Sequence, residues 1–485
     1  MNYRMIGNVI GKVLWVEAAF LLPALVISAV RGETAAVRGF SCALCAMLAA
    51  GLPLGLAVKP KRTEIYARDG LATAGLSWLS VSLFGALPFW VSGAMPKFID
   101  CLFETASGFT TTGATILSDV EALPAGLLYW RSFTHWLGGM GVLVFLLILN
   151  PLSDTRRGSG ESMHLLRAES PGVRITKLVP RMKDSAKILY LIYIALTVLM
   201  FLFLLCGGNP VFDSVTLSFG TAGTGGFAIK NDSVASYSAY TQWVITVFML
   251  LFSVNFNIYF LLLLRQFKKA AKNEELRGFL CIIFFAVAVI MVNTRSYFAT
   301  FGESLRHVSF QVLTILSTSG FITVDFDRWP EFSRAVMLLL MFCGACAGST
   351  GGGLKVVRVQ LLFKSAYRSI SRAFRPNTVK LIHSDGEIID DRTVGAVGTY
   401  FILYMGLLAL ATLLISPDGF SLETNFSAAV SCMNNVGPGL AGVGAVQNYG
   451  AYSGFSKLVL TLTMLIGRLE IYPMLALFSP SAWKR

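Results

Sequence analysis

Charged residues are scarce in this sequence of 485 residues, since Asp, Glu, Lys and Arg together make up only 14% of it. Hydrophobic residues make up 55%, and the mean hydropathy is +0.65. So little charge cannot cover the surface of a large soluble domain. The composition therefore predicts an all-α polytopic membrane protein.

Residues suited to metal binding or catalysis are also few. The four histidines are scattered, and the CxxC pairs Cys42/Cys45 and Cys343/Cys346 lie in apolar helical sequence without a nearby histidine or acid. We interpret these cysteines as small core residues rather than metal ligands. Because no catalytic set converges, the sequence predicts neither an enzyme nor an enzymatic cofactor.

One pattern occurs four times: a short apolar stretch that begins with Phe and runs into a filament of small and polar residues. The copies are 103–115, 212–226, 310–322 and 426–439. Each has a glycine ten or eleven residues after its Phe, and these glycines recur about every hundred residues. The aligned filament residues are Thr111, Thr112 and Gly113; Thr221, Ala222 and Gly223; Thr318, Ser319 and Gly320; and Asn435, Val436 and Gly437.

Backbone groups in such filaments need partners inside a membrane. One solution is that their carbonyls line a water-filled path and replace the hydration shell of a cation. A half-helix before each filament would point its negative C-terminal end at the same place. The alternative is a close-packing interface of small residues between helices. Four copies, each between two apolar segments, favour a pore built from four pieces around one axis.

The hydropathy pattern predicts ten transmembrane helices. Two lie in residues 1–58, and each of four later units reads as span, half-helix with filament, and span (an M1–P–M2 order). The units occupy residues 70–150, 188–264, 278–365 and 394–480. The third unit has a broken second span, whereas the other second spans read as continuous.

Lys and Arg concentrate in the segments that are cytoplasmic if the N-terminus is cytoplasmic, which is the positive-inside pattern. With ten spans, both termini are then expected in the cytoplasm and all four filaments on the outer side. Acids near the filaments would attract cations at the outer mouth, although a solvated loop charge is the simpler reading of each. These acids are Asp119, Glu121, Asp232, Asp325 and Asp327. The first apolar stretch lacks a signal-peptide cleavage pattern and reads as a retained span.

The break in the third unit is a glycine-rich stretch, residues 344–353, followed by Lys355. It cannot form a stable helix, and unwound backbone at membrane depth is tolerated where it lines a cavity. Because it follows the filament on the cytoplasmic side, it is a candidate gate; a helix-end linker is the alternative. The gate residues would be Gly344, Gly348, Ser349, Thr350, Gly351, Gly352, Gly353, Lys355 and Arg468.

Arg468 lies inside the last apolar span, where a cation is costly and needs a reason. Glu470 is two residues away and therefore points largely to another face of a regular helix. Arg468 is expected either to face the pore or to form an ion pair with another unit.

Four such units with one filament glycine each, two added N-terminal spans, the glycine-rich break and the string 467–470 (GRLE) resemble the Trk/Ktr/HKT superfamily of potassium uptake proteins, in particular its bacterial TrkH branch. The resemblance covers essentially the whole chain. It implies K⁺ as the transported ion, bound by filament carbonyls, with the glycine-rich loop as an intramembrane gate and Arg468 in the pore below the filaments.

The resemblance also implies partners: a homodimer with one pore in each protomer, the membrane lipid, and a cytosolic nucleotide-binding ring of the TrkA type. The basic segments 151–187 and 355–380 would be available to that ring. A nucleic-acid partner is not expected, because the net charge of +13 accompanies no nucleic-acid-binding fold.

The filaments depart from the TVGYG sequence of tetrameric potassium channels, so fewer ion sites and weaker selectivity are expected. Glycine in all four filaments is the family's K⁺-preferring pattern. We therefore expect a gated potassium uptake protein of the bacterial inner membrane. The alternative is a secondary transporter that couples K⁺ to H⁺ or Na⁺, which would want a titratable group near the midplane.

Overall fold

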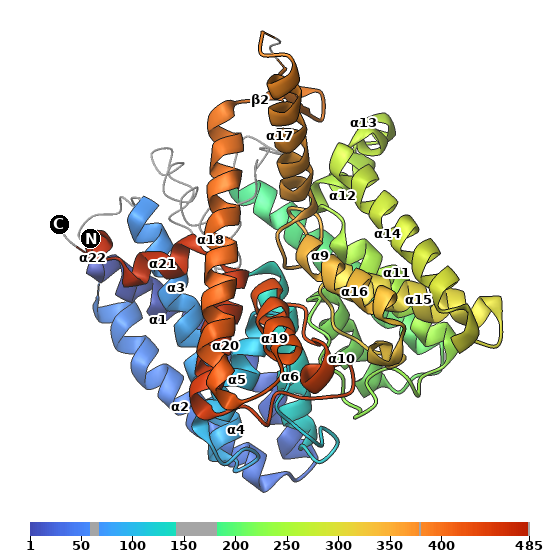
Figure 1. Ribbon diagram of the computed structural model, residues 1–485. Coiled ribbons are helices and arrows are strands. Elements are labelled where there is room, and N and C mark those ends of the chain that lie inside the picture. Colours follow the sequence, from blue (N-terminus) through green and yellow to red (C-terminus); the bar gives the residue numbers. More distant parts are fainter. Residues whose placement is uncertain (59–66, 142–181, 378–379, 484–485) are drawn as a thin grey trace.

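The computed structural model describes residues 1–58, 67–141, 182–377 and 380–483, and these are mostly helical (Figure 1). The prediction of a helical protein rich in apolar helices is confirmed. The part of unit 1 beyond Gly141 and the basic residues 151–181 lie outside the described residues.

Two long apolar helices precede the first unit. α1 (Tyr3–Val30) and α2 (Thr34–Leu52) pack together, and a π-helical turn, η1 (Pro53–Ala57), follows. Their approach is close, because a Cβ on Gly11 would lie 2.5 Å from the backbone nitrogen of Gly55. α1 also packs against helices of unit 1, so the N-terminal pair is part of the main body.

Each unit begins with a long apolar outer helix that packs against a short helix of the same unit. The outer helices are α3 (Ala67–Gly85) with its continuation α4 (Leu87–Val91), α9 (Met182–Cys206), α14 (Glu274–Asn293) and α18 (Asp391–Ile415). The short helices are α5 (Phe98–Phe109), α10 (Val211–Ala222), α15 (Phe301–Leu316) and α19 (Leu422–Asn434). At 12 to 16 residues they are about 18 to 24 Å long, too short to cross a bilayer.

A third helix in each unit lies between two short helices, one from its own unit and one from the next. The third helices are α6 (Ala125–Met140), α11 (Ala239–Ser253), α16 (Glu331–Cys343) and α20 (Gly454–Arg468). α20 packs against α5 of unit 1, where Lys457 Nζ lies 2.7 Å from Asp100 Oδ1. The four units therefore close into a ring.

The third helices are interrupted more often than the sequence predicts. In unit 2, α11 and α12 (Phe256–Leu263) meet at a bend of 90°. In unit 4, Glu470 and Ile471 have positive φ and separate α20 from α21 (Tyr472–Phe478). The prediction of continuous second spans there is wrong, because these breaks occur in sequence without the run of glycines that marks unit 3.

Six helices of the described residues are long and apolar enough to cross a membrane, or seven if the bent pair α11 and α12 counts as one span. The expected ten spans therefore remain a prediction, since the other third helices are short or broken.

One end of the molecule carries a projecting helix and a hairpin, at the top of Figure 1. α17 (Val356–Phe374) follows the glycine-rich loop, and strands β1 (Ile382–Ser384) and β2 (Glu387–Ile389) pair antiparallel. Lys364 of α17 forms an ion pair with Glu274 of α14. The remaining elements are α13 (Phe267–Lys272), α22 (Pro480–Trp483) and the 3-10 turns η3 (Arg295–Tyr297), η4 (Phe326–Arg328), η5 (Ser416–Asp418) and η6 (Ala441–Val443).

Candidate functional site

All four short helices end in the same backbone turn. The first residue of the turn is a Thr or Asn in the left-handed region, with φ between 55° and 59°, and a glycine with positive φ stands two positions later. The first residues are Thr111, Thr224, Thr318 and Asn435, and the glycines are Gly113, Gly226, Gly320 and Gly437. These eight residues are at equivalent places in the four units. We call residues 111–113, 224–226, 318–320 and 435–437 the turn segments.

The turn segments touch one another in a closed cycle. A Cβ built on Gly113 would collide with the carbonyl oxygen of Gly225, and one on Gly226 with that of Ser319. A Cβ on Gly320 would lie 2.5 Å from the carbonyl oxygen of Val436, and one on Gly437 would lie 2.8 Å from that of Thr112. Each glycine thus faces the carbonyl of the next unit, and the fourth unit returns to the first. Only glycine combines the positive φ with this spacing.

The second unit corrects the alignment made from the sequence. Thr221 and Ala222 lie in the last turn of α10, and Thr221 Oγ1 donates to the carbonyl of Leu217 at 2.8 Å. Gly223 packs on α6, where a Cβ would lie 2.5 Å from the carbonyl carbon of His135. The residues equivalent to Thr111, Thr112 and Gly113 lie three positions later, at 224–226. The stretch 221–226 contains two T-x-G strings, and the sequence does not show where the helix ends.

The glycine-rich loop runs from Gly344 to Lys355 and lies against the ends of the short helices. Its Gly352 amide donates to Thr318 Oγ1 at 2.7 Å, and a Cβ on Gly352 would lie 3.0 Å from Asn435 Cβ. Cys346 N donates to the carbonyl of Ser253, at the break in unit 2, at 3.1 Å. The predicted gate residues therefore lie next to the turn segments of units 3 and 4.

Arg468 reaches the same loop from the C-terminal end of α20. Its Nη1 donates to the carbonyl of Thr350 at 2.8 Å, and its Nη2 donates to the carbonyls of Gly138 and Gly139 at 2.5 and 2.9 Å. Glu470 forms an ion pair with Arg358 of α17. Arg468 therefore bridges units 4, 3 and 1 through main-chain carbonyls.

The family model "Cation transport protein" (TrkH) matches residues 39–485 of this chain. The Trk system potassium uptake protein TrkH of Salmonella typhimurium is 34% identical over the whole of both chains. The chain belongs to the TrkH family. The Trk system potassium uptake protein TrkG of Escherichia coli is 30% identical over 100% of this chain and 99% of that protein. The crystal structure of the potassium transporter TrkH from Vibrio parahaemolyticus superimposes with a TM-score of 0.89, at 29% identity, over all of both chains.

Membership of the TrkH family makes the chain a membrane-embedded cation transport protein rather than an enzyme. Its potassium-transport classification follows from the TrkH, TrkG and TrkI relatives, all of which carry the words potassium uptake in their names. In this TrkH-family chain, backbone carbonyls and glycines from all four units meet in the ring of turn segments, and the glycine-rich loop adjoins that ring.

A buried ion pair supports the first two turn segments from behind. Arg131 Nε of α6 donates to Glu104 Oε1 of α5 at 2.6 Å, and the two side chains are almost completely buried. Glu104 also accepts from Thr115 Oγ1 and the amide of Ile116 at 2.9 and 3.0 Å. Arg131 lies over the ring of Phe227 at 3.6 Å from its centroid. The sequence analysis missed this pair, although an acid inside an apolar half-helix is itself a signal.

Hydrogen bonds also hold the fourth turn segment in place. Tyr449 Oη and Ser431 Oγ both donate to the carbonyl of Gly437, at 2.9 and 2.8 Å. Asn435 Nδ2 donates to Thr112 Oγ1 at 2.9 Å, which joins units 4 and 1 across the chain. The Asn at the place of Thr in unit 4 therefore links units 4 and 1 through its side-chain amide.

The acids expected near the filaments make contacts within the protein. Asn231 Nδ2 donates to Asp119 Oδ1 at 2.8 Å, and the Asn231 amide donates to Glu121 Oε1 at 3.0 Å. Asp327 accepts from Arg334 Nε at 3.1 Å and from the amide of Ala441 at 3.0 Å. These carboxylates join neighbouring units, which gives them a structural role whatever they do for ions.

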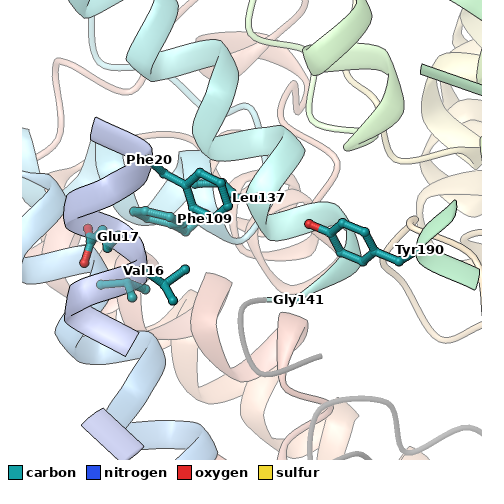
Figure 2. A pocket seen from close by; sticks show the side chains of 8 residues that line it. Val16, Glu17, Phe20, Phe109, Leu137, Gly141 and Tyr190 are labelled. Atoms are coloured by element: carbon teal, nitrogen blue, oxygen red, sulfur yellow. The ribbon is translucent and has the colours of Figure 1, made fainter. Parts of the chain in front are cut away.

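A small cavity lies between α1 and the C-terminal end of α5 (Figure 2). Glu17 stands on one side of it and Tyr190 on the other, with Phe109 between them. Glu17 is 2% exposed, and neither of its carboxylate oxygens has a hydrogen-bond partner in the part of the chain that the structure describes. The sequence analysis did not single out this acid.

Proposed function

We propose that this chain conducts K⁺ along the axis enclosed by the four turn segments. The closed cycle of glycines and carbonyls carries the proposal, because in it a backbone oxygen of each unit lies against a glycine of a neighbouring unit. Backbone carbonyls at such a place replace the hydration shell of a cation. The filter residues would be Thr111, Thr112, Gly113, Thr224, Gly225, Gly226, Thr318, Ser319, Gly320, Asn435, Val436 and Gly437.

Two observations support a monovalent cation. The twelve proposed filter residues carry no formal charge, so backbone dipoles would replace water without binding the ion too tightly. All four short helices end at the ring, which directs the negative ends of their dipoles toward it. Relatives across the family are named potassium uptake proteins, which makes K⁺ the expected ion.

The loop from Gly344 to Lys355 would be the gate of this pore. Its Thr350 carbonyl accepts from Arg468 and its Gly352 amide donates to Thr318, which supports a position across the ring at the ends of the short helices. The guanidinium would add a fixed positive charge on the path of the ion. Opening would then need the loop to leave these contacts.

The proposal extends to the setting of the chain. We place it in the bacterial inner membrane with ten spans and both termini in the cytoplasm, as a homodimer whose apolar outer faces contact lipid. A cytosolic nucleotide-binding ring of the TrkA type would dock on the side of α17 and the hairpin, where basic residues such as Lys364, Arg368 and Arg372 gather.

Uptake of ⁸⁶Rb⁺ into K⁺-loaded liposomes that contain only this protein tests the proposal. Uptake blocked by excess K⁺ but not by Na⁺, without a pH or Na⁺ gradient, is the expected result. If uptake needs a proton or Na⁺ gradient, the chain is a coupled symporter instead. If it needs the cytosolic regulator, the pore is held shut in its absence. Shortening the loop at 351–353 should raise flux in a folded protein; a folded variant without added flux would remove the gate.

A further inference from the structure

Glu275 is a buried acid near the N-terminus of α14, with 6% of its surface exposed. Its Oε1 accepts two backbone hydrogen bonds, from Ala347 N at 2.7 Å and from Val357 N at 3.2 Å. Ala347 lies near the start of the glycine-rich loop, and Val357 lies just after its end. One carboxylate oxygen therefore holds both ends of the loop.

The base of the loop closes at the same place. Val356 N donates to the carbonyl of Ala345 at 3.2 Å, and Lys355 has a φ of 72°. Lys355 Nζ folds back onto the carbonyl of Gly351. A segment this rich in glycine has many accessible conformations, so it keeps one only if outside groups hold it. Two groups of opposite charge bind the loop. The carboxylate of Glu275 accepts from the amide of Ala347, and the guanidinium of Arg468 donates to the carbonyl of Thr350.

We propose that Glu275 is a positioning residue whose carboxylate clasps the two ends of the loop and holds it against the turn segments. This inference rests on the proposed role of the loop as a gate. Hydrogen bonds from backbone amides to a buried carboxylate are stronger than neutral ones. Displacing the loop would remove both amide donors and leave Glu275 with the side chain of Asn255. The clasp therefore favours the position of the loop in this structure over any displaced position.

The neighbouring acid provides a matched control. Glu274 forms an ion pair with Lys364 and accepts from the amide of Asp385, so it binds α17 and the hairpin rather than the loop. Glu274→Gln removes the same charge from the same helix end without touching the clasp. Glu275→Gln keeps an acceptor oxygen and the side-chain shape, whereas Glu275→Ala removes the acceptor.

The experiment measures loop release and ion flux separately in the full-length protein in liposomes. Cys346, within the loop, is completely buried, and its reaction with N-ethylmaleimide is located by peptide mass spectrometry. Glu275→Ala should raise the labelling rate of Cys346 and the ⁸⁶Rb⁺ flux about tenfold, Glu275→Gln less, and Glu274→Gln not at all.

Unchanged labelling of Cys346 in folded Glu275→Ala or Glu275→Gln would overturn the clasp. Faster labelling without added flux would support the clasp and contradict the gate, so the two proposals can fail separately. If Glu275→Ala does not fold, Glu275→Gln decides, because it preserves the size of the side chain. Equal acceleration by Glu274→Gln would also overturn the clasp, since it would show a general effect of charge at this helix end.

Discussion

The guanidinium of Arg468 and the carbonyl oxygen of Thr350 are joined by a hydrogen bond of 2.8 Å. This contact links the broken end of α20 in unit 4 to the glycine-rich loop of unit 3. The same guanidinium binds Gly138 and Gly139 at the end of α6 in unit 1. A cation in an apolar span thus donates to backbone oxygens of two other units, and the Thr350 carbonyl is the one that the loop would withdraw on opening.

Arg468→Ala should raise ⁸⁶Rb⁺ flux several-fold, because it removes a fixed positive charge and frees the Thr350 carbonyl. Arg468→Lys keeps the charge but offers fewer donors in another geometry, so it should free the loop while still repelling the ion. Flux into liposomes checks both variants, with the thermal unfolding midpoint as a measure of folding. A lower midpoint with normal flux would instead mean that Arg468 only holds the helices together.

Gly113→Ser should lower K⁺ flux and shift the K⁺/Na⁺ permeability ratio toward Na⁺. Its φ is 77°, and a side chain there would meet the carbonyl of Gly225 in the next unit. Gly93→Ser is a matched control, because Gly93 has the same φ of 77° but no heavy atom within 4 Å of its would-be Cβ. Competition of ⁸⁶Rb⁺ uptake by K⁺ and Na⁺ measures the ratio, and an unchanged ratio in Gly113→Ser would count against the filter.

The register of unit 2 has its own test. Gly226→Ser should change the K⁺/Na⁺ ratio as Gly113→Ser does, since its Cβ would collide with the Ser319 carbonyl. Thr221→Val should leave the ratio unchanged, because the Thr221 hydroxyl donates to the Leu217 carbonyl within α10. Loss of that hydrogen bond should lower the free energy of unfolding by about 1 kcal/mol. The opposite pattern would restore the register read from the sequence.

Local sequence patterns predict the short helices of this protein better than they predict where its long helices break. The short helices and three of the four turn segments follow from apolar stretches that end in Thr, Gly or Asn. Gly223 was mistaken for Gly226 because helix length depends on packing against His135, which is remote in sequence. The breaks at Val254 and Ile471 adjoin contacts with unit 3: Phe256 N donates to the Gly348 carbonyl, and Glu470 pairs with Arg358. Local composition therefore did not reveal them.

Breaking the ion pair of Glu104 and Arg131 should destabilise the protein strongly. Arg131→Met leaves a buried carboxylate behind the first turn segment, which costs about 3–5 kcal/mol of unfolding free energy. The double variant Glu104→Gln with Arg131→Met should recover part of that loss, because the uncompensated charge is gone. Unfolding in detergent measures both of these and the single variant Glu104→Gln. If the double variant is as unstable as the sum of the singles, the pair is not coupled as its 2.6 Å separation indicates.

Glu17→Met should make the protein more stable by about 1–2 kcal/mol, because it removes a buried carboxylate without a partner in the described residues and keeps the side-chain volume. Glu33→Met is the contrasting control. Glu33 accepts from the amides of Ala125 and Gly126 at 2.7 and 3.2 Å, so its loss should destabilise. Thermal unfolding in detergent and ⁸⁶Rb⁺ flux are measured together for both variants. A Glu17→Met protein that is less stable, or that is folded but no longer transports, would show that this carboxylate serves transport or binds a group in the cavity beside Phe109.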